Sequence, residues 1–520
     1  METLQVKITP SVDRFAITQD VEALINIAAP CMTENSSTRT PIDLGVIADV
    51  SGSMTPHMLL LSQSLQFVVE QLGPNDRFFI VSFSTEPKLI FPFSNMDGAA
   101  KLAAIEVCKN LASENSTFLS GGLFMGCDEM TNDISRRPAD RVSKSSLFLM
   151  TDGEATDGLV NLEEIINVLR KRTFRENCRV IPVIPVNPQL PRLFPLLIPE
   201  LKHDPIPDRQ IVDNANHKLG FNISTFGFGP THNETLLRGI ADMGNGMYTF
   251  VQNDKGLPAA FADALGGLLT TTAQDITCVI SPSKLDMFTI DSVRGGQSVV
   301  QKDGVFTVSF ADLQSGEKRD LIVKLRQTDT GRDVITLATL DGPTNSPLLN
   351  VTVNYKNMLH QNEAEVVTGN CSVQFDTDEG LSHTPARRSS DFDVQLMRLQ
   401  VVEALEKANR LAATDRAAAF AHLRSYSSQV NDMMLHQPSD QYNSMSADLS
   451  QAIDTLATQP KSVASKTMTS LSMQHSQQRS STTSAVPSAY SNQYKTQLAE
   501  ASASIVPQRW RSAPPSSSQQ

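Results

Sequence analysis

The stretch IDLGVIADVSGS, residues 42–53, decides the fold. Its first seven residues form an almost continuous apolar run, which is typical of a strand buried on both faces of a parallel sheet. The run ends in three oxygen-bearing side chains on one tight loop, Asp49, Ser51 and Ser53, and Gly52 allows the backbone to turn sharply between them. We therefore expect a buried strand whose end presents polar side chains.

The same pattern recurs further along the chain. Apolar runs at 78–83, 147–150 and 223–228 are expected strands, and segments with apolar residues at helical spacing follow them. Repeated β–α units with buried strands predict an α/β fold, a doubly wound, mostly parallel, Rossmann-like sheet covered by helices on both faces. We assign this α/β unit to residues 41–272.

One part of the α/β unit departs from this pattern. Eight of the 28 prolines fall between Pro182 and Pro207. Prolines this dense cannot lie in a central strand or a helix interior. Residues 179–218 are therefore an expected Pro-rich insertion, which either lies extended on the α/β unit or acts as a partner-docking arm.

The segments around the α/β unit have other patterns. We expect β-strands in residues 1–40, an antiparallel β-sandwich with a strand at Val334–Leu340 in 275–357, and a helical module in 390–458. Residues 461–520 hold 16 Ser, 5 Thr and 8 Gln, and a segment so poor in apolar residues is expected to be a disordered tail. The N-terminal strands could complete the sandwich, which would make the α/β unit an insertion in it.

Charge and cysteine content exclude several classes of protein. The formal net charge is −12 and no basic stripe is present, so nucleic-acid binding is not expected. No apolar run approaches the roughly eighteen residues of a membrane-spanning helix, and no signal peptide is expected at the N-terminus. The six cysteines are far apart without a C-x-x-C pair, which argues against a zinc ribbon and indicates reduced thiols in a cytoplasmic protein.

Two further loops at expected strand ends carry polar groups that match the first. One contains Thr117 and the other contains Asp152. In an open α/β sheet, ligands bind at the carboxyl ends of the strands, so the three loops should lie together. Oxygen ligands that include neutral hydroxyls suit a hard cation, Mg²⁺ or Mn²⁺. Each loop alone could be an ordinary turn or helix cap, but their joint occurrence favours a metal site.

This constellation resembles the von Willebrand factor type A (VWA) domain and its metal-ion-dependent adhesion site (MIDAS), over about the whole α/β unit. The resemblance implies that Ser51 and Ser53 coordinate the metal directly through their hydroxyls. It implies that Thr117 supplies the hydroxyl of the second loop and Asp152 the acid of the third. Asp49 would hold the metal mostly through water.

The order of α/β unit, β-region and helical segment is also similar, more loosely, to intracellular proteins that pair a VWA domain with a Hedgehog/intein-associated C-terminal module. We find neither an autoprocessing cysteine nucleophile nor RING zinc ligands in the sequence. Self-splicing and ubiquitin ligase activity are therefore not expected.

Three functional hypotheses follow. The first is a Mg²⁺-dependent protein-interaction or scaffold protein, in which an Asp or Glu of a partner completes the coordination of the metal. The second is a hydrolase in which the metal activates water. We expect no catalytic residues, because no general base or nucleophile dyad accompanies the metal loops, and this disfavours the enzyme. The third is a purely structural scaffold that binds no metal.

Overall fold

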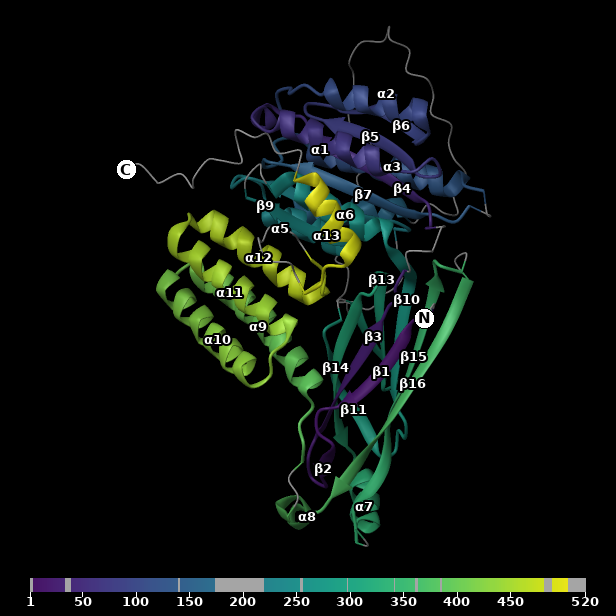
Figure 1. Ribbon diagram of the computed structural model, residues 1–520, viewed down its shortest axis with the longest axis vertical. Helices are drawn as coiled ribbons and strands as arrows, with labels where there is room; N and C mark the ends of the chain where they lie inside the picture. Colours follow the sequence, from purple (N-terminus) through teal and green to yellow (C-terminus); the bar gives the residue numbers. More distant parts are fainter. Residues whose placement is uncertain are drawn as a thin grey trace, which may run out of the picture.

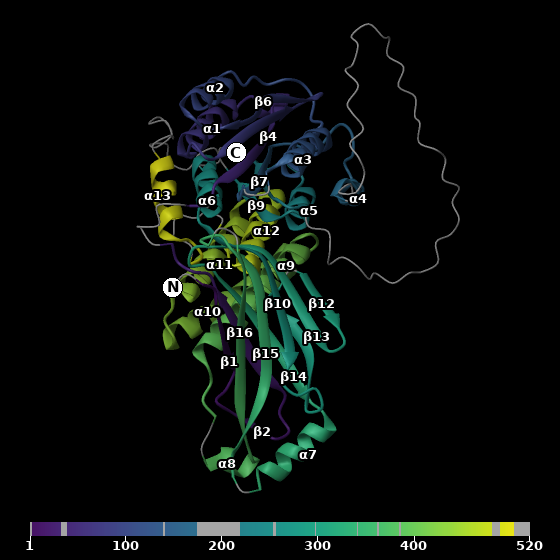
Figure 2. The same cartoon turned by 90° about the vertical axis from the view of Figure 1, so that its right-hand side faces the viewer.

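A computed structural model gives the architecture (Figures 1 and 2). It describes residues 3–32, 39–138, 141–173, 219–252, 256–296, 298–340, 342–360, 363–383, 386–480 and 489–503. An α/β domain lies at one end of the molecule and a β-sandwich extends from it to the other end, while a bundle of helices lies beside their junction. The predicted Pro-rich insertion at 179–218 lies entirely outside the described residues.

The α/β domain contains one six-stranded sheet in the order β6-β5-β4-β7-β8-β9, in which only β6 runs antiparallel to its neighbour. Its elements are β4 (Ile42–Asp49), a 3₁₀ turn (Gly52–Met54), α1 (Met58–Gln71), β5 (Arg77–Phe83), β6 (Pro87–Asn95), α2 (Gly98–Lys109), α3 (Leu119–Arg136), β7 (Lys144–Thr151), α4 (Leu162–Thr173), β8 (Asn222–Phe228), α5 (Glu234–Met243), β9 (Asn245–Val251) and α6 (Leu257–Leu269). The predicted doubly wound, mostly parallel sheet is confirmed.

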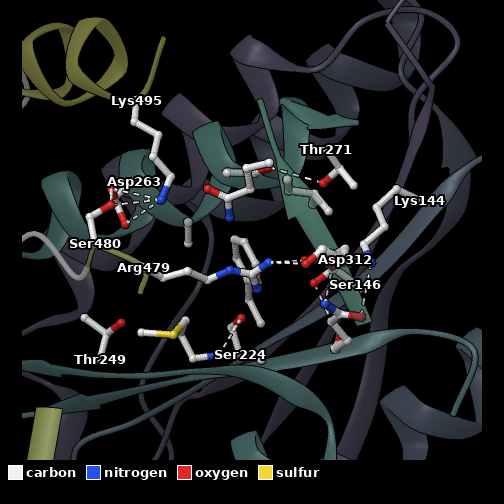
Figure 3. A pocket seen from close by; sticks show the side chains of 18 of the residues that line it. Lys144, Ser146, Ser224, Thr249, Asp263, Thr271, Asp312, Arg479, Ser480 and Lys495 are labelled. Atoms are coloured by element: carbon white, nitrogen blue, oxygen red, sulfur yellow. Dashed lines mark hydrogen bonds and ion pairs between the residues drawn. The ribbon is translucent and has the colours of Figure 1, made fainter. Parts of the chain in front are cut away.

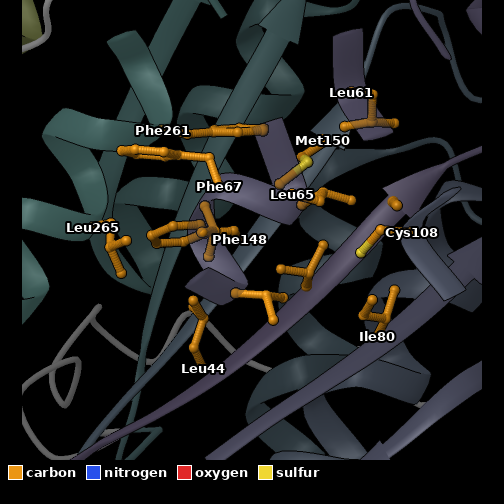
Figure 4. Close-up of a cluster of buried hydrophobic side chains, with 14 of the residues drawn as sticks. Leu44, Leu61, Leu65, Phe67, Ile80, Cys108, Phe148, Met150, Phe261 and Leu265 are labelled. Carbon is orange, nitrogen blue, oxygen red and sulfur yellow. The ribbon is translucent and has the colours of Figure 1, made fainter. Parts of the chain in front are cut away.

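The two faces of this sheet bury separate apolar cores. Figure 4 shows the first, where Leu61 of α1 and Phe261 of α6 lie in one cluster with Phe148 of β7. The second core packs α3, α4 and α5 against the opposite face. Gly45 in β4 is required by this packing, because a Cβ there would lie 2.2 Å from the Phe79 ring. Burial on both faces explains why β4 is apolar almost throughout.

The β-sandwich consists of a four-stranded sheet, β1-β3-β14-β11, and a six-stranded sheet, β12-β13-β10-β15-β16-β2. Its elements are β1 (Gln5–Pro10), β2 (Arg14–Ala16), β3 (Val21–Ala28), β10 (Thr271–Pro282), β11 (Phe288–Arg294), β12 (Ser298–Lys302), β13 (Val305–Gln314), β14 (Lys318–Gln327), α7 (Asp329–Ala338), β15 (Thr344–Asn357), β16 (Glu363–Asp376) and α8 (Asp378–His383). Because β3 pairs with β1 and β14, the N-terminal strands belong to the sandwich and the α/β domain interrupts it.

The sandwich differs from the sequence prediction in two places. The strand predicted at Val334–Leu340 is helix α7, which begins where the Thr328 hydroxyl accepts a hydrogen bond from the backbone N–H of Gly331. The predicted end at residue 357 is too early, because β16 adds a further strand. Most residues of β16 are only partly buried or exposed, and its polar composition hid it from the hydrophobic pattern.

The remaining elements are helices. They are α9 (Ser390–Ala412), α10 (Arg416–His436), α11 (Asp440–Thr458), α12 (Lys461–Gln477) and α13 (Gln493–Ser502). The first four pack around a shared apolar core, while α13 packs on α6 of the α/β domain. Within the described ranges, no helix is both long and apolar enough to cross a membrane.

The predicted disordered tail at 461–520 is wrong for α12 and α13; residues 481–488 and 504–520 lie outside the described ranges. The composition misled because α12 buries polar side chains together with their partners. The Gln474 amide donates to Asp448 Oδ2 over 3.0 Å, and the Thr467 hydroxyl donates to the Val463 carbonyl over 3.0 Å. Because its buried polar groups are hydrogen-bonded within the protein, a helix of this kind can lie in the interior although it has few apolar side chains.

Burial of α12 predicts a stability effect at Leu471, which is 3% exposed in the helical core. Leu471→Ala should lower the free energy of unfolding by about 2–4 kcal/mol, because it removes buried methyl groups and leaves a cavity. Circular dichroism during urea denaturation measures this. The control is Leu435→Ala, at a side chain 78% exposed, which should change the value by less than about 0.5 kcal/mol. Equal, small effects would show that α12 does not pack.

Candidate functional site

The first loop of the candidate site begins at the carboxyl end of the central strand β4. Asp49 is the last residue of that strand and is fully buried. Its carboxylate accepts hydrogen bonds from the Ser51 backbone N–H at 2.8 Å and from the Thr151 hydroxyl at 2.5 Å. Thr151 is the last residue of the neighbouring strand β7, so adjacent parallel strands fix this carboxylate between them.

The two serines connect this carboxylate to the second acid. Ser51 Oγ and Ser53 Oγ lie 3.1 Å apart, and the Ser53 hydroxyl donates to Asp152 Oδ1 over 2.7 Å. Ser51 and Asp152 are buried, whereas Ser53 is exposed. The cluster is therefore reachable from solvent at Ser53.

The second loop brings Thr117 to the same place. A Cβ on Gly153 would lie 3.6 Å from Ser53 Oγ and 3.9 Å from Thr117 Oγ1, so both hydroxyls flank this glycine. Thr117 is only 5% exposed, and its backbone N–H donates to the Thr156 hydroxyl at 3.0 Å. All five side chains predicted from the sequence thus lie together near the carboxyl ends of β4 and β7. The expectation that Thr117 follows a strand is wrong, because its loop connects α2 to α3.

Burial changes the acid–base properties of both carboxyl groups. Loss of hydration raises the pKa of Asp49 to about 6, although its hydrogen bonds to Thr151 and Ser51 oppose the change, and the nearby charge of Asp152 raises it further. Burial likewise raises the pKa of Asp152, against the hydrogen bond from Ser53 and the attraction of His57. Two buried acids close together favour a positive charge between them.

Several residues of the site were missed by the sequence analysis. Thr151 and Thr156 hold Asp49 and Thr117 in place, and the Thr231 hydroxyl donates to the Asp152 carbonyl. His57 Nε2 lies 4.0 Å from Asp152 Oδ2, just before helix α1 begins. These residues lie close to the predicted site in the sequence or in the expected sheet, and that was the one signal that could have identified them. Hydroxyl residues are so common at strand ends that this signal does not distinguish them from others.

The donor set fits a hard cation. It offers two carboxylates and three hydroxyls, all oxygen donors of the kind that Mg²⁺ and Mn²⁺ prefer. Over the described ranges, no group of three or more His, Cys, Asp or Glu side chains is arranged to hold a metal. The hydroxyls of Ser51, Ser53 and Thr117 would therefore have to share in the coordination here.

Comparison with known proteins identifies the α/β domain. Residues 43–263 match the model of the von Willebrand factor type A domain. The chain carries a VWA domain. A solved von Willebrand factor type A structure from Catenulispora acidiphila has a TM-score of 0.60 at 13% identity, covering 91% of this chain and 96% of its own. The ArnB paralog VWA2 from Sulfolobus acidocaldarius has a TM-score of 0.52 at 12% identity, covering 91% and 99%.

At such identities the two structures show that the fold is shared along most of the chain. Among curated proteins, the chain is 22% identical to the uncharacterised YfbK of Escherichia coli K12 over 54% of its own length, and 23% identical to the E3 ubiquitin-protein ligase WAV3 of Arabidopsis thaliana over 59%. The aligned regions span only 41% of YfbK and 34% of WAV3.

The buried charge of Asp49 leads to a pH-dependent prediction in metal-free buffer. Its pKa is about 6 in the folded protein and 3.8 in a model peptide, so ionisation between about pH 4 and pH 6 destabilises the folded state relative to the unfolded chain. Asp49→Asn should therefore be more stable than wild type at pH 7.5 with chelator, by about 1–3 kcal/mol, and this advantage should vanish below about pH 4.

Chemical denaturation at several pH values, followed by circular dichroism, measures this difference. Asp157→Asn is the matched control, because that carboxylate is exposed on the third loop and its replacement should change the free energy of unfolding by less than about 0.5 kcal/mol. An Asp49→Asn variant that is less stable than wild type at pH 7.5 without metal would contradict the electrostatic description of the site.

Proposed function

We propose that this protein is a Mg²⁺-dependent protein-interaction or scaffold protein, whose MIDAS binds an acidic residue of a partner protein. The observation that supports this most is the convergence of two buried carboxylates and three hydroxyls at one end of the VWA sheet. In this proposal Ser51 and Ser53 hold the metal directly, Thr117 and Asp152 complete the set, and Asp49 acts mostly through water.

The distribution of charge explains why the partner should present an Asp or Glu. A bound Mg²⁺ would carry two positive charges, whereas the three hydroxyls are neutral and Asp49 would act mostly through water, so Asp152 would be the one acid of the set in direct contact with the ion. The exposed Ser53 marks the side from which a partner carboxylate can approach. A carboxylate is favoured over a neutral amide there because charge-assisted contacts are the stronger ones.

Two further assignments belong to the proposal. We propose a cytoplasmic location, supported by the dispersed cysteines, of which those that the structure describes are free thiols. The second hypothesis is a hydrolase in which the same metal site would activate water. Hydrolysis of generic phosphate and peptide substrates, assayed with Mg²⁺ and with chelator, separates this hypothesis from binding.

Metal binding should be visible as thermal stabilisation. Mg²⁺ at tenfold its Kd stabilises the folded form by roughly 1.4 kcal/mol, which should raise the melting temperature of a domain of this size by about 3–6 °C. Asp49→Asn should abolish the rise, because the neutral amide attracts the cation less, whereas Asp157→Asn should keep it. Differential scanning calorimetry measures both. An equal rise in wild type and Asp49→Asn would place the bound metal elsewhere.

The hydroxyl of Thr117 should matter for partner binding more than for stability. Thr117→Ala should weaken Mg²⁺-dependent capture of partners by about tenfold, a loss of roughly 1.4 kcal/mol, and should change the free energy of unfolding by no more than about 1 kcal/mol. Thr117→Ser, which keeps the hydroxyl, is the control and should bind normally. The measurement is affinity capture from native extract with Mg²⁺ or chelator, quantified by mass spectrometry. Partners that survive both chelator and Thr117→Ala would bind another surface.

A further inference from the structure

A cavity of about 50 Å³, which we call the junction cavity, lies between the VWA domain, the β-sandwich and the C-terminal helices (Figure 3). Its walls come from the amino-terminal halves of β7 and β8, from α6, from β13 and from residues at α12 and α13. The residues that matter here are Lys144, Asp263, Asp312, Gln314, Arg479 and Lys495. Because a buried water needs roughly 10–15 Å³ of such space, the cavity can hold a few waters or one small ion.

Positive charge exceeds negative charge among the side chains that line the junction cavity. Its wall has three cations, Lys144, Arg479 and Lys495, and two carboxylates, Asp263 and Asp312, and none of the five residues is more than 6% exposed. Lys495 pairs with Asp263 at 3.4 Å, whereas Asp312 is shared by Lys144 and Arg479. Figure 3 shows Arg479 between these two groups. One cation therefore lacks a carboxylate of its own in the wall.

The acid next to the cavity does not remove this excess. Arg479 Nε donates to Glu317 Oε1 at 2.9 Å, but Glu317 also forms an ion pair with Arg319, and both of these residues are buried. The buried ion pairs at the cavity thus contain four cations (Lys144, Arg319, Arg479 and Lys495) and three carboxylates (Asp263, Asp312 and Glu317). A buried excess charge is costly unless a counter-ion balances it.

Two hydrogen-bond donors on the cavity wall also have no acceptor among the residues that the structure describes. Arg479 uses Nε and Nη2 for its bonds to Glu317 and Asp312, and Nη1 donates to none of these residues. The side-chain amide of Gln314 lies over Gly267, where a Cβ would be 2.4 Å from Nε2, and it has no partner there either. Buried donors without an acceptor indicate a missing water or ion, and beside an excess positive charge an anion is the stronger acceptor.

We infer that the junction cavity binds one small inorganic anion, a halide such as chloride or a small oxyanion such as phosphate. The anion accepts hydrogen bonds from Arg479 Nη1 and the Gln314 amide and balances the excess positive charge. Because Lys144 belongs to the VWA domain, Gln314 to the sandwich and Arg479 to the C-terminal segment, one ion stabilises the contact of all three. The site is independent of the proposed metal site, which lies at the opposite, carboxyl ends of the strands.

Thermal unfolding of the full chain by scanning calorimetry tests this at pH 7.5 with chelator. Ionic strength is held constant by exchanging gluconate, which is larger than the cavity, for chloride, bromide or phosphate. The melting temperature of wild type should rise saturably, by about 1–2 °C at tenfold the Kd of the anion. Lys495→Met removes the excess charge and should weaken anion binding at least tenfold. Lys324→Met, in an ion pair with Asp20 that is partly exposed, is the matched control and should keep the wild-type rise.

A second variant and a direct measurement complete the experiment. Gln314→Leu removes a donor without changing any charge, so it should weaken anion binding severalfold even if Lys495→Met fails to fold. Wild-type crystals grown in bromide should show an anomalous-scattering peak beside Arg479 Nη1, and a saturable rise in phosphate alone would identify the ion as an oxyanion. A salt effect that is equal in wild type, Lys495→Met and Gln314→Leu, or one that never saturates, would overturn the proposal.

Discussion

The structure depends on one constraint, a carboxylate buried at the end of the central strand. Asp49 follows seven residues that are fully buried, and neighbouring backbone and side-chain donors hold it where water cannot hydrate it. A buried acid is tolerated only where its environment is arranged around it. The strand order, the tight turn at Gly52 and the position of β7 all contribute to that arrangement, because each brings a hydrogen-bond donor or a second polar loop close to Asp49.

The part of this architecture that follows from local pattern could be predicted from the sequence. Buried parallel strands such as β4 have near-continuous apolar runs, and their ends must meet at one edge of the sheet, so Asp49 and Asp152 could be placed together from the sequence. This rule does not account for Thr117, which lies between α2 and α3 and follows no strand. The supporting residues could not be predicted either. Thr151, Thr156 and His57 act through contacts that depend on the register of neighbouring strands and on the path of loops, and no spacing rule encodes either.

The misplaced elements, α12 and α7, have two different physical reasons. Composition and periodicity measure how much apolar surface a segment can bury, but α12 is buried through hydrogen bonds and ion pairs that its neighbours supply. His475 of α12, for example, lies 3.0 Å from Asp448, and the fully buried Arg398 donates to the His475 carbonyl. Helix α7 was predicted as a strand because the β-branched residues Val334 and Ile335 favour strands locally. The N-terminal cap at Thr328 starts a helix there instead.

The buried charge clusters at the two ends of the VWA sheet differ in the direction of their pKa shifts. Burial alone would raise the pKa of Asp312 and Glu317, but the nearby Arg479, with Lys144 and Arg319, outweighs it and holds the pKa of both below the ordinary range. At Asp49 burial wins, and the pKa rises to about 6. Both sets of acids are deeply buried, yet their pKa values shift in opposite directions. The reason is that Asp312 and Glu317 lie beside Arg and Lys side chains of the protein, whereas no nearby cation contributes to the shift of Asp49. The charge balance thus separates a structural junction, which contains its own cations, from the acid cluster at which we propose that a cation from solution binds.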